Sequence, residues 1–386
     1  MSIVKIFKLW YNSFIKFMGC FMDRIRWLNN RCKKFIRIRT KKNKNKERTK
    51  KKNNEKNQGE RNQRTLTKKQ GNSKSKYKKP HYTFIAPEIF SLEKNPEKTL
   101  KFFESVNSVK NKKRMHSAFF IDSENIQEIG IESLMYLTAI LRDTKNNIFL
   151  KYSFKGNFPK NENAKQTFIE SGFLSFVESN GKNLVPKSNK IQISCGISND
   201  AEKAKSICKF IHTTCGFNRI QTMPLYNILV ELMGNTIQHA YKDMDNSGLT
   251  TNEWFVYAEE FKEYVDFVFL DTGDGIPKTV FKKLHEKFIL IGKSDAEFIQ
   301  SALGGEFRTK TEQKHRGKGL NEIDKLFREV DFLQDLVIYS GRGCCRMVQD
   351  ENKSKYLYEI SNINGTSIGT LFKWRVNKNN KGEYND

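Results

Sequence analysis

The sequence predicts an α+β protein whose main part is an α/β sandwich, with helices on one face of a mixed, largely antiparallel sheet. Three observations support this prediction. Within residues 192–377, helical patterns come first and strand patterns mostly follow. Within residues 80–185, strand and helix patterns alternate, which is typical of a small α/β unit. Residues 1–79 are strongly basic and form a separate tail.

The tail carries almost all of the net charge of +26. Residues 1–79 hold 27 Lys and Arg against 4 Asp and Glu, which leaves 42 against 39 in the rest of the 386 residues. An electrostatic partner, such as nucleic acid or an anionic membrane surface, is therefore expected to bind the tail rather than the folded body.

Residues 1–30 repeat large apolar side chains at helical spacing and are interrupted by Lys and Arg. The longest run without a polar residue, from Phe17 to Met22, is far shorter than the ~20 residues that span a bilayer. No small-residue cleavage signature follows, so a signal peptide is not expected. We expect a basic amphipathic helix, bound either to a membrane surface or partner groove or to the protein's own body.

Residues 31–79 are nearly free of apolar side chains and cannot offset the entropy of ordering. We expect a disordered linker that either binds anionic lipid or nucleic acid through charge alone or is simply solvated. The seven cysteines form no CxxC pair and no zinc-type array, which indicates a reducing cytoplasm. The expected location is cytoplasmic, with membrane-surface association through the N-terminal helix as an open alternative.

The small α/β unit is predicted from four segments between residues 80 and 185. They read in order as strand, helix, strand and helix: 117–126, 131–143, 147–156 and 162–173.

The second unit is expected to begin with two helices, over 199–215 and from Pro224 onward. Two strands follow in "EWFVYAEEFKEYVDFVFLDTGDGIP" and end in a Gly-rich turn. A helix is predicted over 319–330. The stretches "LVIYSG", "KYLYEI" and "GTLFKWRV" are the last predicted strands, and 378–386 is a tail.

The helix after Pro224 carries Glu231, Asn235 and His239, which are four residues apart and therefore share one face. The opposite, packed face is expected to consist of apolar side chains, namely Leu225, Ile228, Leu229, Leu232 and Ile237. Alone, this pattern indicates only an amphipathic helix.

Two glycine-rich clusters favour a ligand site instead. Asp271 follows four apolar residues, and a carboxylate at a buried strand end is costly unless it is paired, for example with the exocyclic amine of a purine. Gly273 and Gly275 would let the backbone turn against a flat ligand, although a plain hairpin turn has the same pattern.

The second cluster, "HRGKGL", places Gly317 and Gly319 before a predicted helix, where free backbone N–H groups suit phosphate oxygens. Lys318 adds positive charge, but an ordinary glycine-rich loop remains an alternative, and no P-loop motif occurs. The charged segment 276–316 is compatible with a lid that closes over a ligand.

In this order, and with Gly369-Thr370 opening a late strand, these motifs resemble the GHKL (Bergerat-fold) ATPase superfamily over residues 192–377. Glu231 and Asn235 match the N-box, Asp271, Gly273 and Gly275 the G1-box, and Gly317, Gly319 and Leu320 the G2-box.

The resemblance implies bound ATP and Mg²⁺, with a role for each matched residue. Asn235 would ligate Mg²⁺, and Glu231 would act as general base or position the nucleophile. Asp271 would hold the adenine amine with help from Thr370. Gly317, Lys318, Gly319 and Leu320 would lie at the phosphates, and His239 would lie near them.

Within the superfamily, "ELMGNTIQHAY" is most similar to the histidine-kinase-like ATP domains of anti-sigma-factor serine kinases. No upstream histidine lies in a phosphoacceptor hairpin, so a sensor histidine kinase is not expected. Serine kinases of this type commonly dimerise, which makes a homodimer an expectation from the resemblance.

The α/β unit "AFFIDSENIQEIGIESLMYLTAIL" looks like a STAS domain, the antagonist fold of such kinases. With Asp122 placed on the family's strand-end Asp, Ile131 and Glu132 stand where an Asp-Ser phosphoacceptor pair would lie. The acceptor is therefore missing, although Ser133 is adjacent. Glu132 is interpreted either as a surface residue of the helix or as a permanent negative charge.

Together these features predict a regulatory, Mg²⁺-dependent ATP-binding protein that acts with a partner protein. The nucleophile is either water, in an ATPase, or a partner's Ser or Thr hydroxyl, in a protein kinase. The alternative is a nucleotide-gated interaction switch with negligible turnover, which the basic tail directs to a membrane or nucleic acid.

Overall fold

The structure is a computed structural model in which the described residues fall into eight stretches. They are residues 82–108, 118–146, 153–177, 187–238, 252–284, 292–305, 319–349 and 356–379. All of them belong to one compact unit that runs from Lys78 to Asp386. The predicted N-terminal helix over 1–30 and the linker over 31–79 lie outside the described residues.

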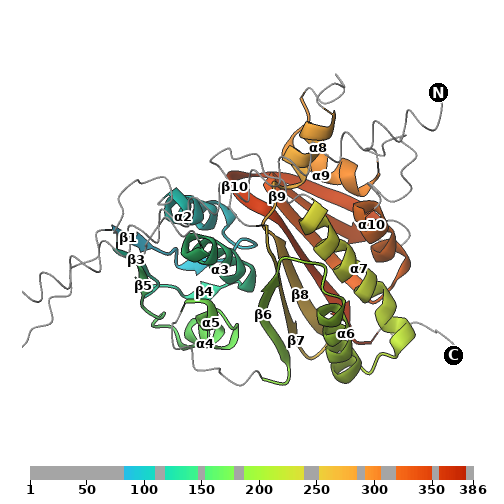
Figure 1. Ribbon diagram of the computed structural model, residues 1–386, viewed down its shortest axis with the longest axis horizontal. Coiled ribbons are helices and arrows are strands. Elements are labelled where there is room, and N and C mark those ends of the chain that lie inside the picture. The colour runs from blue at the N-terminus through green and yellow to red at the C-terminus, as the bar shows by residue number, and fades with distance from the viewer. Residues whose placement is uncertain are drawn as a thin grey trace, which may run out of the picture. The chain divides into compact units, whose positions relative to one another are not determined.

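A five-stranded sheet forms the centre of this unit, with the strand order β6-β7-β8-β10-β9 (Figure 1). Its strands are β6 (Lys190–Gly196), β7 (Trp254–Glu260), β8 (Tyr264–Asp271), β9 (Leu333–Gln349) and β10 (Tyr356–Asn377). Every described pair in it is antiparallel, whereas the sequence predicts a mixed, largely antiparallel sheet. Short connections such as the one between β7 and β8 favour antiparallel neighbours, because parallel strands need long crossovers.

Helices cover one face of this sheet (Figure 1). They are α6 (Ala201–Cys215), α7 (Arg219–Gln238), α8 (Ile276–Leu284), α9 (Asp295–Leu303) and α10 (Gly319–Glu329). The predicted helices over 199–215 and 319–330 are thus confirmed with small changes of boundary. α8 and α9 also place apolar side chains in this core, so much of the segment predicted as a lid is packed structure.

The helix that carries Glu231 begins at Arg219, and the prediction that Pro224 opens it is wrong. The backbone N–H of Asn218 donates to the Gln221 side chain, and the N–H of Gln221 donates to the Asn218 side chain, both at 2.8 Å. This reciprocal pair is a capping box and starts the helix one turn earlier. Pro224 then lies inside the helix, where it costs one backbone hydrogen bond.

The N-terminal segment alternates strands and helices, as predicted. Its parallel sheet has the order β1-β3-β5, and two further strands, β2 and β4, form a parallel pair. The strands are β1 (Tyr82–Ile85), β2 (Ile89–Phe90), β3 (Ala118–Asp122), β4 (Glu128–Ile129) and β5 (Ser153–Gly156). The helices are α2 (Pro96–Asn107), α3 (Ile131–Asn146), α4 (Glu162–Glu170) and α5 (Leu174–Val177).

This N-terminal segment covers the second face of the five-stranded sheet. One buried cluster combines α2 and α3 side chains such as Phe103 and Leu137 with sheet side chains such as Phe255, Val268 and Leu371. We call it the shared core. Alternate residues of β8 therefore point to different partners: Val265, Phe267 and Phe269 to the helices α6–α10, and Val268 and Leu270 to the shared core.

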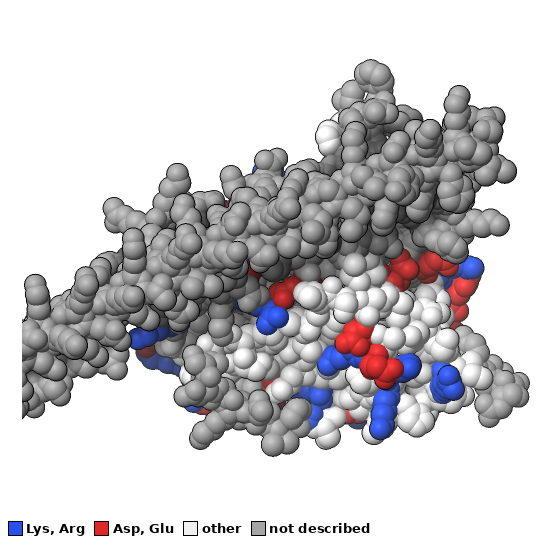
Figure 2. Space-filling view, viewed as in Figure 1, with Lys and Arg blue, Asp and Glu red and all other residues white. Residues whose placement is uncertain are grey.

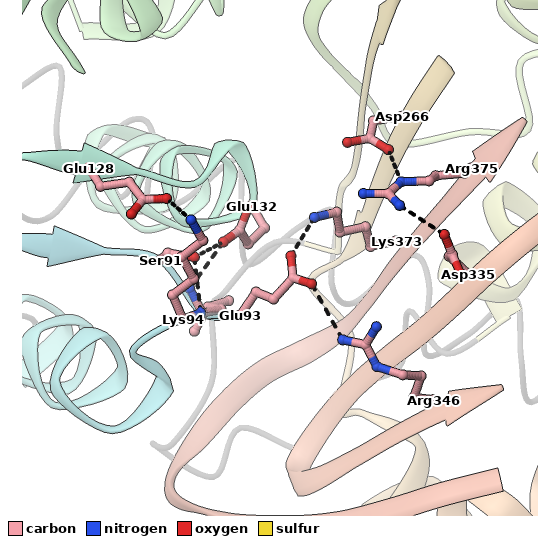
Figure 3. Close-up of polar contacts among 11 residues, drawn as sticks. Ser91, Glu93, Lys94, Glu128, Glu132, Asp266, Asp335, Arg346, Lys373 and Arg375 are labelled. Carbon is pink, nitrogen blue, oxygen red and sulfur yellow. Dashed lines mark hydrogen bonds and ion pairs between the residues drawn. The ribbon is translucent and has the colours of Figure 1, made fainter. Parts of the chain in front are cut away.

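Ion pairs join the N-terminal segment to the five-stranded sheet (Figure 3). Glu93 lies beside β10 and β9 and accepts hydrogen bonds from Lys373 at 2.6 Å and Arg346 at 3.3 Å. Burial raises the pKa of Glu93, but the interactions with Lys373 and Arg346 outweigh it and leave the pKa lowered. The carboxylate is therefore held in its charged form between two strands of the sheet.

Glu132 on α3 is buried, with 3 % of its surface exposed, so it is not a surface residue of the helix. Its Oε1 accepts hydrogen bonds from the Ser91 hydroxyl at 2.8 Å and from the backbone N–H of Leu92 at 3.1 Å (Figure 3). Ser133 is also fully buried, and its Oγ has no hydrogen-bond partner among the described residues. In this conformation Ser133 is inaccessible to a kinase.

The described surface mixes acidic and basic side chains. Figure 2 shows Lys and Arg next to Asp and Glu on the face that it presents, as expected for a body that is close to neutral. Of the helices within the described stretches, none is both long and apolar enough to cross a bilayer.

Candidate functional site

The helix α7 positions the first cluster of candidate residues. Its buried side chains Leu225, Ile228, Leu229, Leu232 and Met233 pack in the core between the helices and the sheet. Ile237, predicted on this packed face, is 36 % exposed, and Thr236 takes the buried position and bonds the carbonyl of Leu232 at 3.0 Å. Packing of one face fixes the rotation of α7 and leaves Glu231 and Asn235 half-buried on another.

Glu231 and Asn235 interact with each other. The Asn235 side chain lies close enough to the Glu231 carboxylate to affect its pKa, as the spacing of four residues allows. Burial raises the pKa of Glu231, the polar Asn235 side chain lowers it, and repulsion by Glu322 on α10 raises it again, so that the net direction is upward. This carboxyl is therefore more basic than an exposed glutamate.

Gly319, the first residue of α10, lies against the Glu231 side chain. A Cβ atom built on Gly319 would overlap Oε1 of Glu231, so only glycine fits this position without displacing the carboxylate. Leu320 beside it packs against the core of α6–α10. The structure thus brings two motifs together that are 88 positions apart in the sequence. His239, Gly317 and Lys318 lie outside the described residues.

Asp271 forms the second cluster, at the end of β8. It stands opposite Trp254 of β7 and opposite Thr370 of β10 in the sheet register. Its Oδ1 accepts the backbone N–H of Gly273 at 2.8 Å, which orients the carboxylate over the turn. Gly275 has φ +85°, so the predicted tight turn requires glycine there.

Ser340 on β9, which no sequence motif predicts, holds this turn in place. Its fully buried Oγ accepts the N–H of Ile276 at 2.8 Å and donates to the carbonyl of Gly369 at 3.0 Å. The Thr370 hydroxyl is also 3.0 Å from this oxygen. The only sequence signal is a polar residue at the end of the apolar stretch "LVIYS", which is too common to single out.

Thr272 connects the turn to the N-terminal segment through Glu253. The Thr272 hydroxyl accepts the N–H of Glu253 at 2.8 Å, and the Glu253 carbonyl accepts the N–H of Thr272 at 3.0 Å. Glu253 is a buried residue, with 3 % of its surface exposed. Its two carboxylate oxygens accept the Nε–H of Arg142 on α3 at 2.9 and 3.0 Å. A chain of hydrogen bonds therefore runs from α3 to the turn. No motif predicted Glu253 or Arg142.

The two clusters share α7, which contacts both α10 and β8. The chain matches no known protein-family model and no curated protein sequence.

The oxygen donors that are present decide whether a magnesium ion fits this site. Among the described residues no group of three or more His, Cys, Asp or Glu side chains could hold a metal ion. Mg²⁺, however, prefers oxygen donors and is commonly held by one or two protein groups together with substrate phosphates. The Glu231 carboxylate and the Asn235 amide oxygen fit such a site only if a phosphate-bearing ligand supplies further donors.

Proposed function

We propose that residues 192–377 bind ATP with Mg²⁺ in the manner of GHKL proteins, and that the protein hydrolyses ATP or transfers its γ-phosphate to a partner's Ser or Thr in a regulatory role. The contact of Glu231 with Gly319 carries this proposal, because it joins the N-box-like helix to the G2-box-like helix start. The pairing of Asp271, at the end of β8, with Thr370, within β10, supports it independently.

The chemistry assigned to each cluster follows from its groups. Asp271 offers a half-buried acceptor for an amine such as that of adenine. Mg²⁺, when bound, would neutralise charge on the phosphates. Asn235 would supply an oxygen to it, and the N-terminus of α10 suits the phosphates themselves. A glutamate with a raised pKa, such as Glu231, accepts a proton near neutral pH more readily than an ordinary one.

A nucleotide-gated switch is the second candidate, and the hydrogen bonds from Thr272 through Glu253 to Arg142 favour it. A ligand that moved the turn at Asp271 would also shift α3, because these hydrogen bonds connect the two. A nucleotide could then change the surface of the N-terminal segment without turnover, if it bound the two turn conformations with different affinity.

The test measures binding and turnover separately. Mg-ATP binding to the full chain is titrated for wild type, for Asp271→Asn and for the control Glu202→Gln on the exposed side of α6. Asparagine keeps an oxygen for the Gly273 N–H but replaces the carboxylate, so we expect affinity to fall by about tenfold or more. The control should bind as wild type does.

Phosphate release and radiolabel transfer are then compared for wild type and Glu231→Gln. A loss of turnover in the variant with ATP binding retained supports the enzyme. Binding without turnover above that of the variant supports the switch. Absence of Mg-ATP binding to wild type contradicts both forms of the proposal.

A further inference from the structure

A cavity of about 330 Å³ lies inside the N-terminal segment, among β3, β5 and the helices α3, α4 and α5. β3 and β5 are parallel neighbours, so their carboxyl ends lie at one edge of the sheet. Ser123 directly follows β3, Asn157 directly follows β5, and both line the cavity. In open α/β sheets, ligands bind outside the carboxyl ends of the strands. None of the described lining residues belongs to residues 192–377, so the cavity is separate from the candidate nucleotide site.

The wall of the cavity is almost entirely apolar. Four phenylalanines line it together with leucine, isoleucine and valine side chains. The buried members of this wall are Ile121, Leu137, Leu141, Phe168 and Phe173. Protein interiors are close-packed, and side chains that line a void lose the contacts that a filling group would make. The volume lies within the range of small-molecule sites, so the wall suits a ligand with an apolar body.

Ser123 supplies a polar group inside the cavity. The residue is 3 % exposed, and its hydroxyl forms no hydrogen bond with any other described residue. This hydroxyl is not among the unpaired polar atoms that are closed off on all sides, so the small surface that Ser123 exposes includes Oγ. Since Ser123 lines the cavity, Oγ can be reached from it. A buried polar group without a partner is unfavourable and rare in native proteins, and a ligand oxygen in the cavity would provide the missing partner.

The other polar groups at this edge do not favour a charged ligand. Asn157 is already paired, because its Oδ1 accepts the N–H of Ser123 at 2.7 Å and its Nδ2 donates to Asp122 Oδ1 at 2.8 Å. Lys155 is the one charged side chain of the described lining, and it is exposed, so its ammonium group lies in water at the rim. The interior therefore offers a neutral hydroxyl and no ion, and burying a charge that is not paired is costly.

We propose that this cavity binds an uncharged small molecule that has a flat, apolar body and one hydrogen-bonding oxygen, of the class of phenols and alcohols. The oxygen of the ligand forms a hydrogen bond with the Ser123 hydroxyl, which can both donate and accept. The body of the ligand lies against Phe168 and Phe173, where aromatic rings pack well against each other. This assignment does not depend on ATP binding.

The test uses 2-naphthol, which is uncharged at neutral pH, and follows its fluorescence during titration with the full chain. The anion 2-naphthoate has nearly the same shape and is titrated in parallel. For a ligand of about ten non-hydrogen atoms we expect a Kd on the order of 0.1–1 mM. Binding of 2-naphthol should be saturable. Binding of 2-naphthoate should be weaker by about tenfold or more, because the interior holds no cation for its carboxylate.

Ser123→Ala tests the hydroxyl. Because this hydroxyl has no partner among the described residues, its removal should leave the melting temperature unchanged or raised, whereas a structural role would require a loss. The same substitution should weaken binding of 2-naphthol by about three- to tenfold. Ser206→Ala, on the exposed side of α6, is the matched control and should bind as wild type does.

Leu174→Phe tests the space itself. Leu174 lines the cavity from α5 and is partly exposed, so a larger side chain can enter the cavity without displacing the buried wall. Binding of 2-naphthol should weaken by about threefold or more, with the melting temperature retained. Absence of saturable binding to wild type, equal binding of 2-naphthoate, or wild-type affinity in Ser123→Ala or in Leu174→Phe would each overturn the proposal.

Discussion

The two faces of the five-stranded sheet differ in where their partners come from. The face toward α6–α10 packs against helices from the same half of the sequence, such as α7 with Leu229. The other face packs against α2 and α3, whose residue Leu137 precedes its sheet partner Leu371 by more than 200 positions. The difference shows that the two successive units predicted from the sequence share one of their hydrophobic cores.

The largest loss of stability is expected when these two units are separated. A fragment of residues 187–386 would expose the apolar side chains of the second face, namely Phe255, Tyr257, Val268, Leu270, Val337 and Leu371. We expect this fragment to aggregate or to lose fixed tertiary packing, because large exposed apolar patches are not tolerated in soluble proteins. Gel filtration, dye binding and denaturant unfolding against residues 78–386 provide the check. Cooperative unfolding of a monomeric 187–386 fragment would show that the second face is dispensable.

An intermediate effect is expected at the ion pair between α3 and the sheet. Arg142→Met leaves the buried Glu253 carboxylate without its cation, which we expect to cost about 2 kcal/mol, since Arg142 itself is partly exposed. The double variant Arg142→Met/Glu253→Gln should recover part of this loss. Lys101→Met, which breaks an exposed pair with Glu97, should change stability by less than about 0.5 kcal/mol. Denaturant midpoints measure all three, and equal effects of Arg142→Met and Lys101→Met would contradict the structure.

The smallest change in stability is expected for Glu231 on α7, on the side of the sheet that is covered by α6–α10. Folding raises its pKa above the ordinary value of 4.5, so the folded state binds this proton more tightly than the unfolded state. The associated stabilisation is complete below pH 4.5 and is lost as pH rises through the folded-state pKa. Glu231→Gln lacks this titration, so its melting temperature relative to wild type should rise between pH 4 and pH 7 by about 1–2 °C. A difference that stays constant over this range would exclude the raised pKa.

Much of the fold follows from patterns in the sequence. The helices over α3, α6 and α10 and the strands β7 and β8 lie where periodicity and apolar runs predict them. The sequence also indicates that the sheet is covered on both faces. "WFVYA" and "FVFL" are continuous apolar runs, which are typical of strands buried on both sides rather than on one. Periodicity shows that a face is covered, but not by which distant segment.

Only some residues of the candidate site are likewise predictable from the sequence. Glycines at turns and a carboxylate after an apolar strand are rare enough in combination to single out Asp271 and Gly275. Ser340, Glu253 and Arg142 could not be found, because each is an ordinary polar residue whose partner is set only by tertiary packing. Glu132 shows the same limit: its position on a helix predicts exposure, and only the fold supplies Ser91 and Leu92 as donors.

The shared core also has a consequence for biosynthesis. Leu137 on α3 leaves the ribosome 234 residues before Leu371 on β10, a delay of about 12–50 s at ordinary elongation rates. Until the end of that interval the apolar side of α3 lacks its partners on β9 and β10, such as Val337 and Leu371. We expect the nascent chain to be held by chaperones until the last strand is made, and slowly translated codons between β8 and β10 would lengthen this exposed stage.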